Sequence, residues 1–160
     1  PHPWILNIFF SFFSAKGIYI VIWLGIFFYL VFFEEKRNKT FILYFFLSLV
    51  IAALSVTLIK NLTARPRPLS QVKNEKLKMK NYPSDYSFPS GHATVSFALA
   101  GILSFFDTKK KKYFYLIVAL IAFSRIYLGY HYVSDVIIGA VLGWLISWTL
   151  LIKLKMKNDF

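Results

Sequence analysis

The chain has 160 residues, of which 58% are hydrophobic and 20% aromatic, and its formal net charge is +12. A water-soluble domain of this length cannot bury so much Phe, Ile and Leu, so the composition indicates an integral membrane protein. The positive charge does not indicate nucleic-acid binding, because the basic residues lie in short connectors between apolar segments and no recognised nucleic-acid module interrupts them. The absence of cysteine excludes disulfides and thiol chemistry.

In chain order, the apolar segments predict an all-α, polytopic membrane helix bundle with about five transmembrane helices, in a single domain of residues 1–160. Pro1–Ser14 is apolar but too short to cross a bilayer, so it is predicted to be an N-terminal interfacial helix. The five spans are predicted at residues 17–33, 41–59, 91–106, 113–126 and 135–152. The proline-containing segment 61–90 predicts an extramembrane loop, in which Leu69–Lys80 could form a short amphipathic helix.

The basic residues of the short connectors predict the orientation in the membrane. With five spans, the connectors 34–40 and 107–112 and the C-terminal tail lie on one side and together hold ten Lys and Arg. Because short connectors weigh most in the positive-inside rule, this side is predicted to be cytoplasmic. The loop 61–90 then faces outward, although it is basic as well. Since the first residue is Pro1 and not Met, we expect the natural start to have been trimmed or processed.

Residues with catalytic potential fall into three clusters that share the predicted outer side. Ionisable groups at the membrane edge are costly and therefore indicate function. Lys, Arg, His and Asp side chains without an array of metal ligands suit an anion with several oxygens, which means phosphate, so we expect neither a metal nor a cofactor. The clusters are Lys60 with Arg67-Pro68, then Pro89-Ser90-Gly91-His92, and finally Arg125, His131 and Asp135.

The residue types predict how phosphate would be held. Arg67 and Arg125 can offer planar guanidinium groups to phosphate oxygens, and Lys60 can supply a point charge. Ser90 and Gly91 begin a predicted helix, where backbone N–H groups and the positive end of the helix dipole form an anion site. The glycine also lets the backbone approach an oxygen closely.

The spacing of the remaining residues predicts a nucleophile and an acid. His131 lies four residues before Asp135, so this carboxylate can accept from one ring nitrogen and leave the other free to attack phosphorus. His92, on another helix, is placed to protonate the leaving oxygen and then to activate water.

Each of these residues also has a simpler interpretation. The long cationic side chains could extend to the interface or bind lipid headgroups without any catalytic role. His92 at a helix N-terminus could be structural, and Asp135 could be a partner of the helix dipole.

The three clusters together resemble a family signature. Lys60–Pro68 reads K-x6-R-P, Pro89–His92 reads P-S-G-H, and Ser124–Asp135 reads S-R-x5-H-x3-D. This ordered set, over residues 60–135, closely resembles the three-part signature of the type-2 phosphatidic acid phosphatase family. Each part by itself is weak evidence for the family, whereas the three parts in this order are specific for it.

The resemblance implies a metal-independent lipid phosphatase that acts through a phosphohistidine at the outer face of a bacterial inner membrane. His131 would be the nucleophile, Asp135 its orienting partner and His92 the general acid and then base. The phosphoryl oxygens would be held by Lys60, Arg67, Ser90, Gly91 and Arg125. Many bacterial members of the family have six spans, so five spans with an interfacial helix is a departure from the pattern.

Several substrates and two other functions stay open at this point. The candidate substrates are undecaprenyl diphosphate, the 1-phosphate of lipid A, phosphatidylglycerophosphate and phosphatidic acid, with a preference for diphosphate carriers or lipid A. The alternative function is a non-catalytic anionic-lipid-binding or transport-associated membrane protein, which would need the cations but not both histidines and Asp135. A vanadate site like that of the vanadium haloperoxidases is disfavoured because those proteins are soluble. The expected partners are membrane lipids and no nucleic acid.

Overall fold

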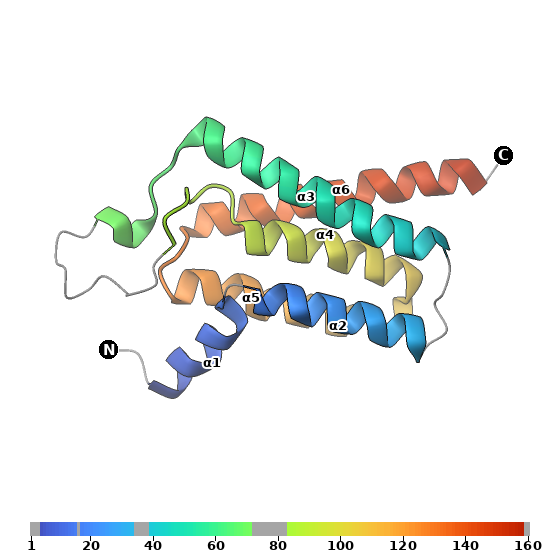
Figure 1. Cartoon of the computed structure of the whole chain (residues 1–160), viewed down its shortest axis with the longest axis horizontal. Helices are drawn as coiled ribbons and strands as arrows, with labels where there is room; N and C mark the ends of the chain where they lie inside the picture. Colours follow the sequence, from blue (N-terminus) through green and yellow to red (C-terminus); the bar gives the residue numbers. More distant parts are fainter. Residues whose placement is uncertain (1–3, 16, 34–38, 72–82, 159–160) are drawn as a thin grey trace.

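The computed structural model describes residues 4–15, 17–33, 39–71 and 83–158, and the regular elements in this part of the chain are all helices (Figure 1). The predicted all-α class is therefore confirmed. The elements are α1 (Trp4–Ser14), α2 (Ile18–Phe32), α3 (Lys39–Thr63), the 3-10 turn η1 (Pro68–Gln71), α4 (Gly91–Phe106), the 3-10 turn η3 (Thr108–Lys110), α5 (Lys111–Tyr127) and α6 (Val133–Asn158).

Helices α2 to α6 lie side by side and alternate in direction along the chain (Figure 1). The segments between α3 and α4 and between α5 and α6 therefore meet at one end, which we call the loop end; it comprises residues 64–71, 83–90 and 128–132. Turn η3 and the end of α6 lie at the opposite end. Helix α1 is angled away from α2 and packs beside α5 at the loop end.

The helix boundaries follow the predicted spans closely, with three differences. Helix α4 begins and ends where predicted, but α3 continues past residue 59 to Thr63. The predicted C-terminal tail is helical, because α6 continues past the predicted span to Asn158. Of the predicted helix Leu69–Lys80, the structure describes only the turn η1, and residues 72–82 lie outside the described part.

By length and composition, two helices of the described chain can cross a bilayer: α3 over its whole length and α6 over Val133–Leu154. Helices α1 and α2, whose axes differ by 63°, would add a third if the pair is one span. Helix α4 is apolar but has 16 residues. At about 1.5 Å per residue it is roughly 24 Å long, shorter than a hydrocarbon core of about 30 Å. The count of five spans stays a prediction.

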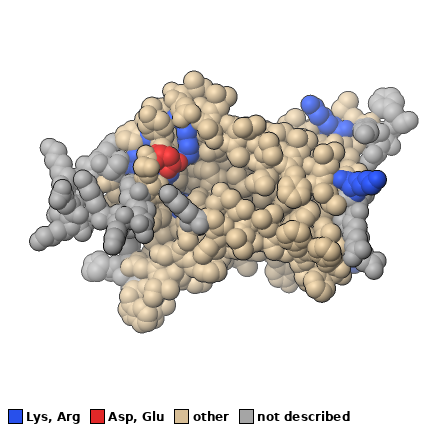
Figure 2. Space-filling view, in the orientation of Figure 1, with Lys and Arg blue, Asp and Glu red and all other residues tan. Residues whose placement is uncertain are grey.

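The surface has the pattern of a membrane protein. Leu54 and Leu58 on α3 and Trp144 and Trp148 on α6 are about half or more exposed. Figure 2 shows that, on the face in view, the Lys, Arg, Asp and Glu atoms of the described residues gather at the two ends of the bundle. The stretch between the two ends on this face is uncharged, as expected for the part that meets lipid tails.

Helix α4 is the centre of the bundle and packs against α3, α5 and α6. Its contact with α6 is close because two glycines one turn apart, Gly139 and Gly143, face it. A Cβ atom at Gly139 would lie 2.8 Å from the Ser90 carbonyl oxygen, and one at Gly143 would collide with the Thr94 carbonyl. Small residues at this spacing let two membrane helices approach closely. The approach places the start of α4 against the start of α6.

We predict that Gly143→Ala destabilises the protein, because the added methyl group must push α6 away from the Thr94 carbonyl. Overpacking of this kind costs about 1–3 kcal/mol, which should appear as a fall of several degrees in thermal unfolding of the detergent-solubilised protein. Gly25→Ala in α2 is the matched control, since a Cβ atom there meets nothing within 4 Å. Equal unfolding temperatures for the two variants would contradict the close α4–α6 contact.

Candidate active site

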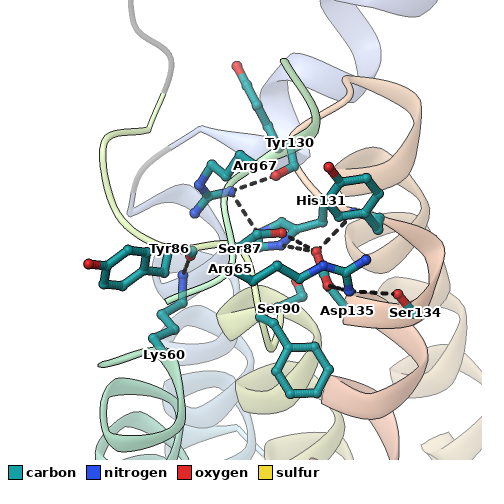
Figure 3. A network of polar contacts seen from close by, with 12 residues as sticks. Lys60, Arg65, Arg67, Tyr86, Ser87, Ser90, Tyr130, His131, Ser134 and Asp135 are labelled. Carbon is teal, nitrogen blue, oxygen red and sulfur yellow. Dashed lines mark hydrogen bonds and ion pairs between the residues drawn. The ribbon is translucent and has the colours of Figure 1, made fainter. Parts of the chain in front are cut away.

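Backbone hydrogen bonds bring the three predicted clusters together at the loop end (Figure 3). Ser87 N–H donates to the Arg65 carbonyl at 2.8 Å, which joins the two halves of the loop between α3 and α4. Ser90 N–H donates to the Asp135 carbonyl at 3.0 Å, which joins the start of α4 to α6. His131 N–H donates to the Arg125 carbonyl at 3.2 Å across the turn between α5 and α6.

That turn depends on Gly129, whose φ of +66° lies in the left-handed region. Glycine adopts this conformation without the steric cost that a Cβ atom brings. The reversal at Gly129 directs the chain back over the end of α5, and His131 is buried as a result, with 3% of its surface exposed.

The two nitrogens of His131 have different surroundings. Its Nε2 lies 3.0 Å from Nη1 of Arg67, and its Nδ1 lies 3.5 Å from Oδ2 of Asp135, longer than a hydrogen bond. A guanidinium can only donate, so Nε2 is the acceptor and the proton of the neutral ring is on Nδ1, on the side of the carboxylate. This is the tautomer in which Nε2 has a lone pair available for a nucleophilic attack.

Asp135 is completely buried and is held by donors from three segments. Arg65 Nη1 donates to Oδ1 at 2.7 Å, while Ser87 Oγ and the Tyr132 N–H donate to Oδ2, the latter at 2.9 Å. Arg65 also donates to Ser134 Oγ at 2.9 Å and lies over the Tyr132 ring. A buried carboxylate is stable only with such partners.

Lys60 and Arg67, both predicted to bind phosphate, converge on Asp85. Lys60 Nζ lies 2.5 Å from Oδ2 of Asp85, and Arg67 Nη2 lies 2.7 Å from Oδ1. Arg67 further donates from Nε to the Asp85 carbonyl at 2.9 Å and from Nη1 to the Tyr130 carbonyl at 2.7 Å. Lys60 also donates to the Tyr86 carbonyl.

Burial and nearby charges shift the pKa of His131 and of Asp85, which lie in the loops at this end. Burial is the main cause that lowers the pKa of His131, to about 4; Asp135 opposes this, and the charges of Arg67, Arg125 and Lys60 add to it. Burial alone would raise the pKa of Asp85, but its hydrogen bond from Lys60 and the charge of Arg67 outweigh that and hold it at about 2. At neutral pH His131 is therefore neutral and Asp85 is ionised.

Several buried polar atoms at the site have no hydrogen-bond partner in the part of the chain that the structure describes. Buried polar groups are normally paired, so such atoms call for an explanation. Among the described residues these atoms include Ser90 Oγ, His92 Nε2, Arg125 Nε and His131 Nδ1. All four belong to residues that the sequence predicts to contact or activate phosphate, and they include both donors and acceptors.

The N-terminal helices supply two side chains that sequence reasoning missed. The ring of Tyr19 on α2 lies against His92 with 3.9 Å between centroids and an angle of 38° between the ring planes. Ser14, the last residue of α1, accepts from Arg125 Nη1 through its carbonyl oxygen at 2.8 Å and also through Oγ. Arg125, which lies against the face of the Tyr130 ring, is thus held by protein groups through Nη1, while its Nε has no hydrogen-bond partner among the described residues.

The structure thus places all eight predicted site residues in the loop end or in the helix ends next to it, and it adds others. Arg65, Asp85 and Ser87 belong to the same polar network, yet the sequence offered little to identify them. Arg65 stands two residues before Arg67, in the pattern R-P-R-P, and this repeated arginine was the one available signal. Asp85 and Ser87 lie in a loop without any periodic pattern.

We predict that Arg67→Gln raises the pKa of His131 from about 4 toward its ordinary value of 6.5. The substitution removes a positive charge next to Nε2, and a nearby like charge disfavours the protonated ring. The measurement is a pH titration of ¹⁵N-labelled histidine by NMR. Lys112→Gln, at the far end of the bundle, should leave this pKa unchanged, and a pKa still near 4 in Arg67→Gln would contradict the arrangement.

Known proteins are similar to this chain along most of its length. A Bacitracin transport permease protein BcrC of Bacillus licheniformis is 29% identical over 93% of this chain and 70% of its own. An Undecaprenyl-diphosphatase of Sulfolobus acidocaldarius is 31% identical over 77% of this chain and 58% of its own, so the chain spans less than two thirds of that relative. The crystal structure of a transmembrane PAP2-type phosphatidylglycerolphosphate phosphatase from Bacillus subtilis superposes with a TM-score of 0.68 at 25% identity, over 98% of this chain and 79% of that one.

The family model of the PAP2 superfamily matches residues 41–159, which includes all three predicted motifs. This match covers well over half of the chain, and it agrees with the helical architecture shared with the solved phosphatase. The resemblance predicted from K-x6-R-P, P-S-G-H and S-R-x5-H-x3-D is confirmed, and the chain belongs to the PAP2 superfamily of membrane phosphatases.

Proposed function

We propose that the protein hydrolyses a lipid phosphate or diphosphate through a phosphohistidine intermediate. The observation that carries this proposal is the environment of His131. Its Nε2 lies beside Arg67 Nη1, and its Nδ1 faces the buried carboxylate of Asp135. A neutral imidazole oriented by a carboxylate and adjoining a cation is suited to attack a phosphorus atom whose oxygens that cation binds.

In the first step, His131 Nε2 forms a bond to phosphorus and the phosphorus–oxygen bond to the lipid breaks. His92 gives a proton to the leaving oxygen, so the lipid departs as a neutral alcohol or as a monophosphate. The imidazolium that forms on His131 is stabilised by Asp135 through the Nδ1 proton. In the second step, His92 takes a proton from water, the water oxygen bonds to phosphorus, and the nitrogen–phosphorus bond breaks to release inorganic phosphate.

The proposed binding groups for the phosphoryl oxygens come from three elements. Lys60 at the end of α3 and Arg67 in the loop supply positive charge, as does Arg125 at the end of α5. The N–H groups at the start of α4, next to Ser90 and Gly91, add an anion site with the helix dipole behind it. Preorganised donors of this kind stabilise the charge that spreads over the oxygens in the transition state.

We further propose that the chain is a single domain with five spans in a bacterial inner membrane, with the loop end facing outward. The basic residues near η3 support this orientation, since Lys109–Lys112 lie at the opposite end from the site. A lipid tail could then stay in the bilayer while its phosphate reaches His131. Of the candidate lipids we favour diphosphate carriers such as undecaprenyl diphosphate, which the name of the Sulfolobus relative supports, or lipid A.

A second candidate is lipid binding or transport without turnover, because one relative is named as a transport permease. The two functions make different demands on His131. Binding needs cations, and Lys60, Arg67 and Arg125 would suffice for it. A transport-associated protein should therefore bind phosphate lipids equally well after His131→Ala and should release no phosphate from them.

We expect the purified wild-type protein to release inorganic phosphate from at least one lipid of a panel that contains undecaprenyl diphosphate, lipid A, phosphatidylglycerophosphate and phosphatidic acid. His131→Ala and Asp135→Asn should lower the rate by roughly a thousandfold or more, because the nucleophile or its orienting partner is lost. Asp107→Asn is the control, since this buried acid pairs with Lys110 at the far end. Full activity in His131→Ala would exclude the phosphohistidine route.

We expect His92→Ala to lose more activity toward a lipid alkyl phosphate than toward an aryl phosphate. An alkoxide is a poor leaving group and needs a proton, whereas a nitrophenolate leaves without one. The first turnover should be measured by rapid quench, so that the later role of His92 toward water does not enter. Equal losses toward the two substrates would contradict the assignment of His92 as the acid.

A further inference from the structure

Asp85 lies between the two cations proposed to bind phosphate, and each of its carboxylate oxygens forms an ion pair with one of these cations. Oδ2 lies 2.5 Å from Lys60 Nζ, and Oδ1 lies 2.7 Å from Arg67 Nη2. The Asp85 carbonyl also accepts from Arg67 Nε at 2.9 Å. Neither the sequence motifs nor the proposed reaction assigns a role to this residue.

The arrangement resembles the way in which two oxygens of a phosphoryl group would be held. A carboxylate and a phosphoryl group both present two negatively charged oxygens on one central atom, and both suit a lysine and an arginine donor. The guanidinium of Arg67 lies 3.0 Å from His131 Nε2 through Nη1. If a phosphoryl group lies with its phosphorus within reach of Nε2, its oxygens contact the same guanidinium that binds Asp85.

The two acidic residues of the network differ in how firmly they are held. Asp135 has no exposed surface and is bound by Arg65, Ser87 and the Tyr132 N–H. The Asp85 side chain is 58% exposed. The Asp85 carboxylate is already largely hydrated, so it can turn out into water without opening the packed interior. The same movement of Asp135 would disrupt a buried network.

We infer that Asp85 competes with phosphate for Lys60 and Arg67, and so sets the affinity of the site for substrate and for inorganic phosphate. Its carboxylate binds both cations between turnovers, yields them to the phosphoryl group when substrate enters, and binds them again as the product phosphate leaves. This inference rests on the proposed phosphatase function and on the phosphate-binding roles of Lys60 and Arg67.

A purely structural role for Asp85 predicts the opposite result. If the carboxylate served only to position Lys60 and Arg67 for phosphate, its loss would leave both side chains less ordered and would weaken the binding of phosphate. If it competes, its loss should strengthen that binding. The sign of the change therefore separates the two roles.

The experiment compares wild type with Asp85→Asn, which keeps the size of the side chain and removes its charge. We expect inorganic phosphate to bind Asp85→Asn about tenfold more tightly, measured directly by calorimetry on the detergent-solubilised protein and as an inhibition constant against a lipid phosphate. The KM should fall as well, because substrate no longer displaces a charged group. Asp85→Glu should return the affinity toward that of wild type, and Asp107→Asn, at the far end of the bundle, should leave it unchanged.

Phosphate affinity in Asp85→Asn that is unchanged or weaker would overturn the inference. The same is true if Asp107→Asn tightens binding equally, because the effect would then reflect net charge alone. Direct phosphate binding needs no turnover, so the proposed function is tested separately. Absence of lipid hydrolysis by wild type would refute that function, while tighter phosphate binding by Asp85→Asn would still show the competition.

Discussion

The buried charge of Asp135 is the constraint on which the site depends. A carboxylate without exposed surface is costly unless donors surround it, and here they come from the loop after α3, the segment before α4 and the turn before α6. Each donor that satisfies the carboxylate also ties one of these segments to α6. The same carboxylate faces His131 Nδ1 at 3.5 Å, on the side opposite to the Arg67 guanidinium that lies beside Nε2.

Close packing within the bundle makes this network possible. The Ser90 N–H can reach the Asp135 carbonyl because Gly139, one turn into α6, leaves room for the start of α4. Because α2 to α6 alternate in direction, the C-terminal ends of α3 and α5 both lie at the loop end. The predicted site residues come from distant parts of the chain and meet because the antiparallel packing of the helices places these helix ends together.

The two acidic residues of the loop end differ in exposure. Asp135 and its neighbour His131 are almost fully buried, whereas the Asp85 side chain is 58% exposed and binds Lys60 and Arg67. The proposed reaction would use both properties, because the proposed nucleophile must be oriented and the phosphate product must leave. The helices α1 and α2 enclose the site further through Ser14 and Tyr19.

Apolar length and motif spacing are local properties of the chain, so they suffice to predict the membrane class, the helices and the eight residues of the three motifs. The folded structure was needed to find that Arg65 and Ser87 hold Asp135, that Asp85 binds two cations and that Tyr19 lies against His92. These contacts join residues far apart in the sequence, and loop residues carry no periodicity that would indicate their partners. The close α4–α6 packing and the need to satisfy a buried carboxylate determine which side chains meet at the loop end.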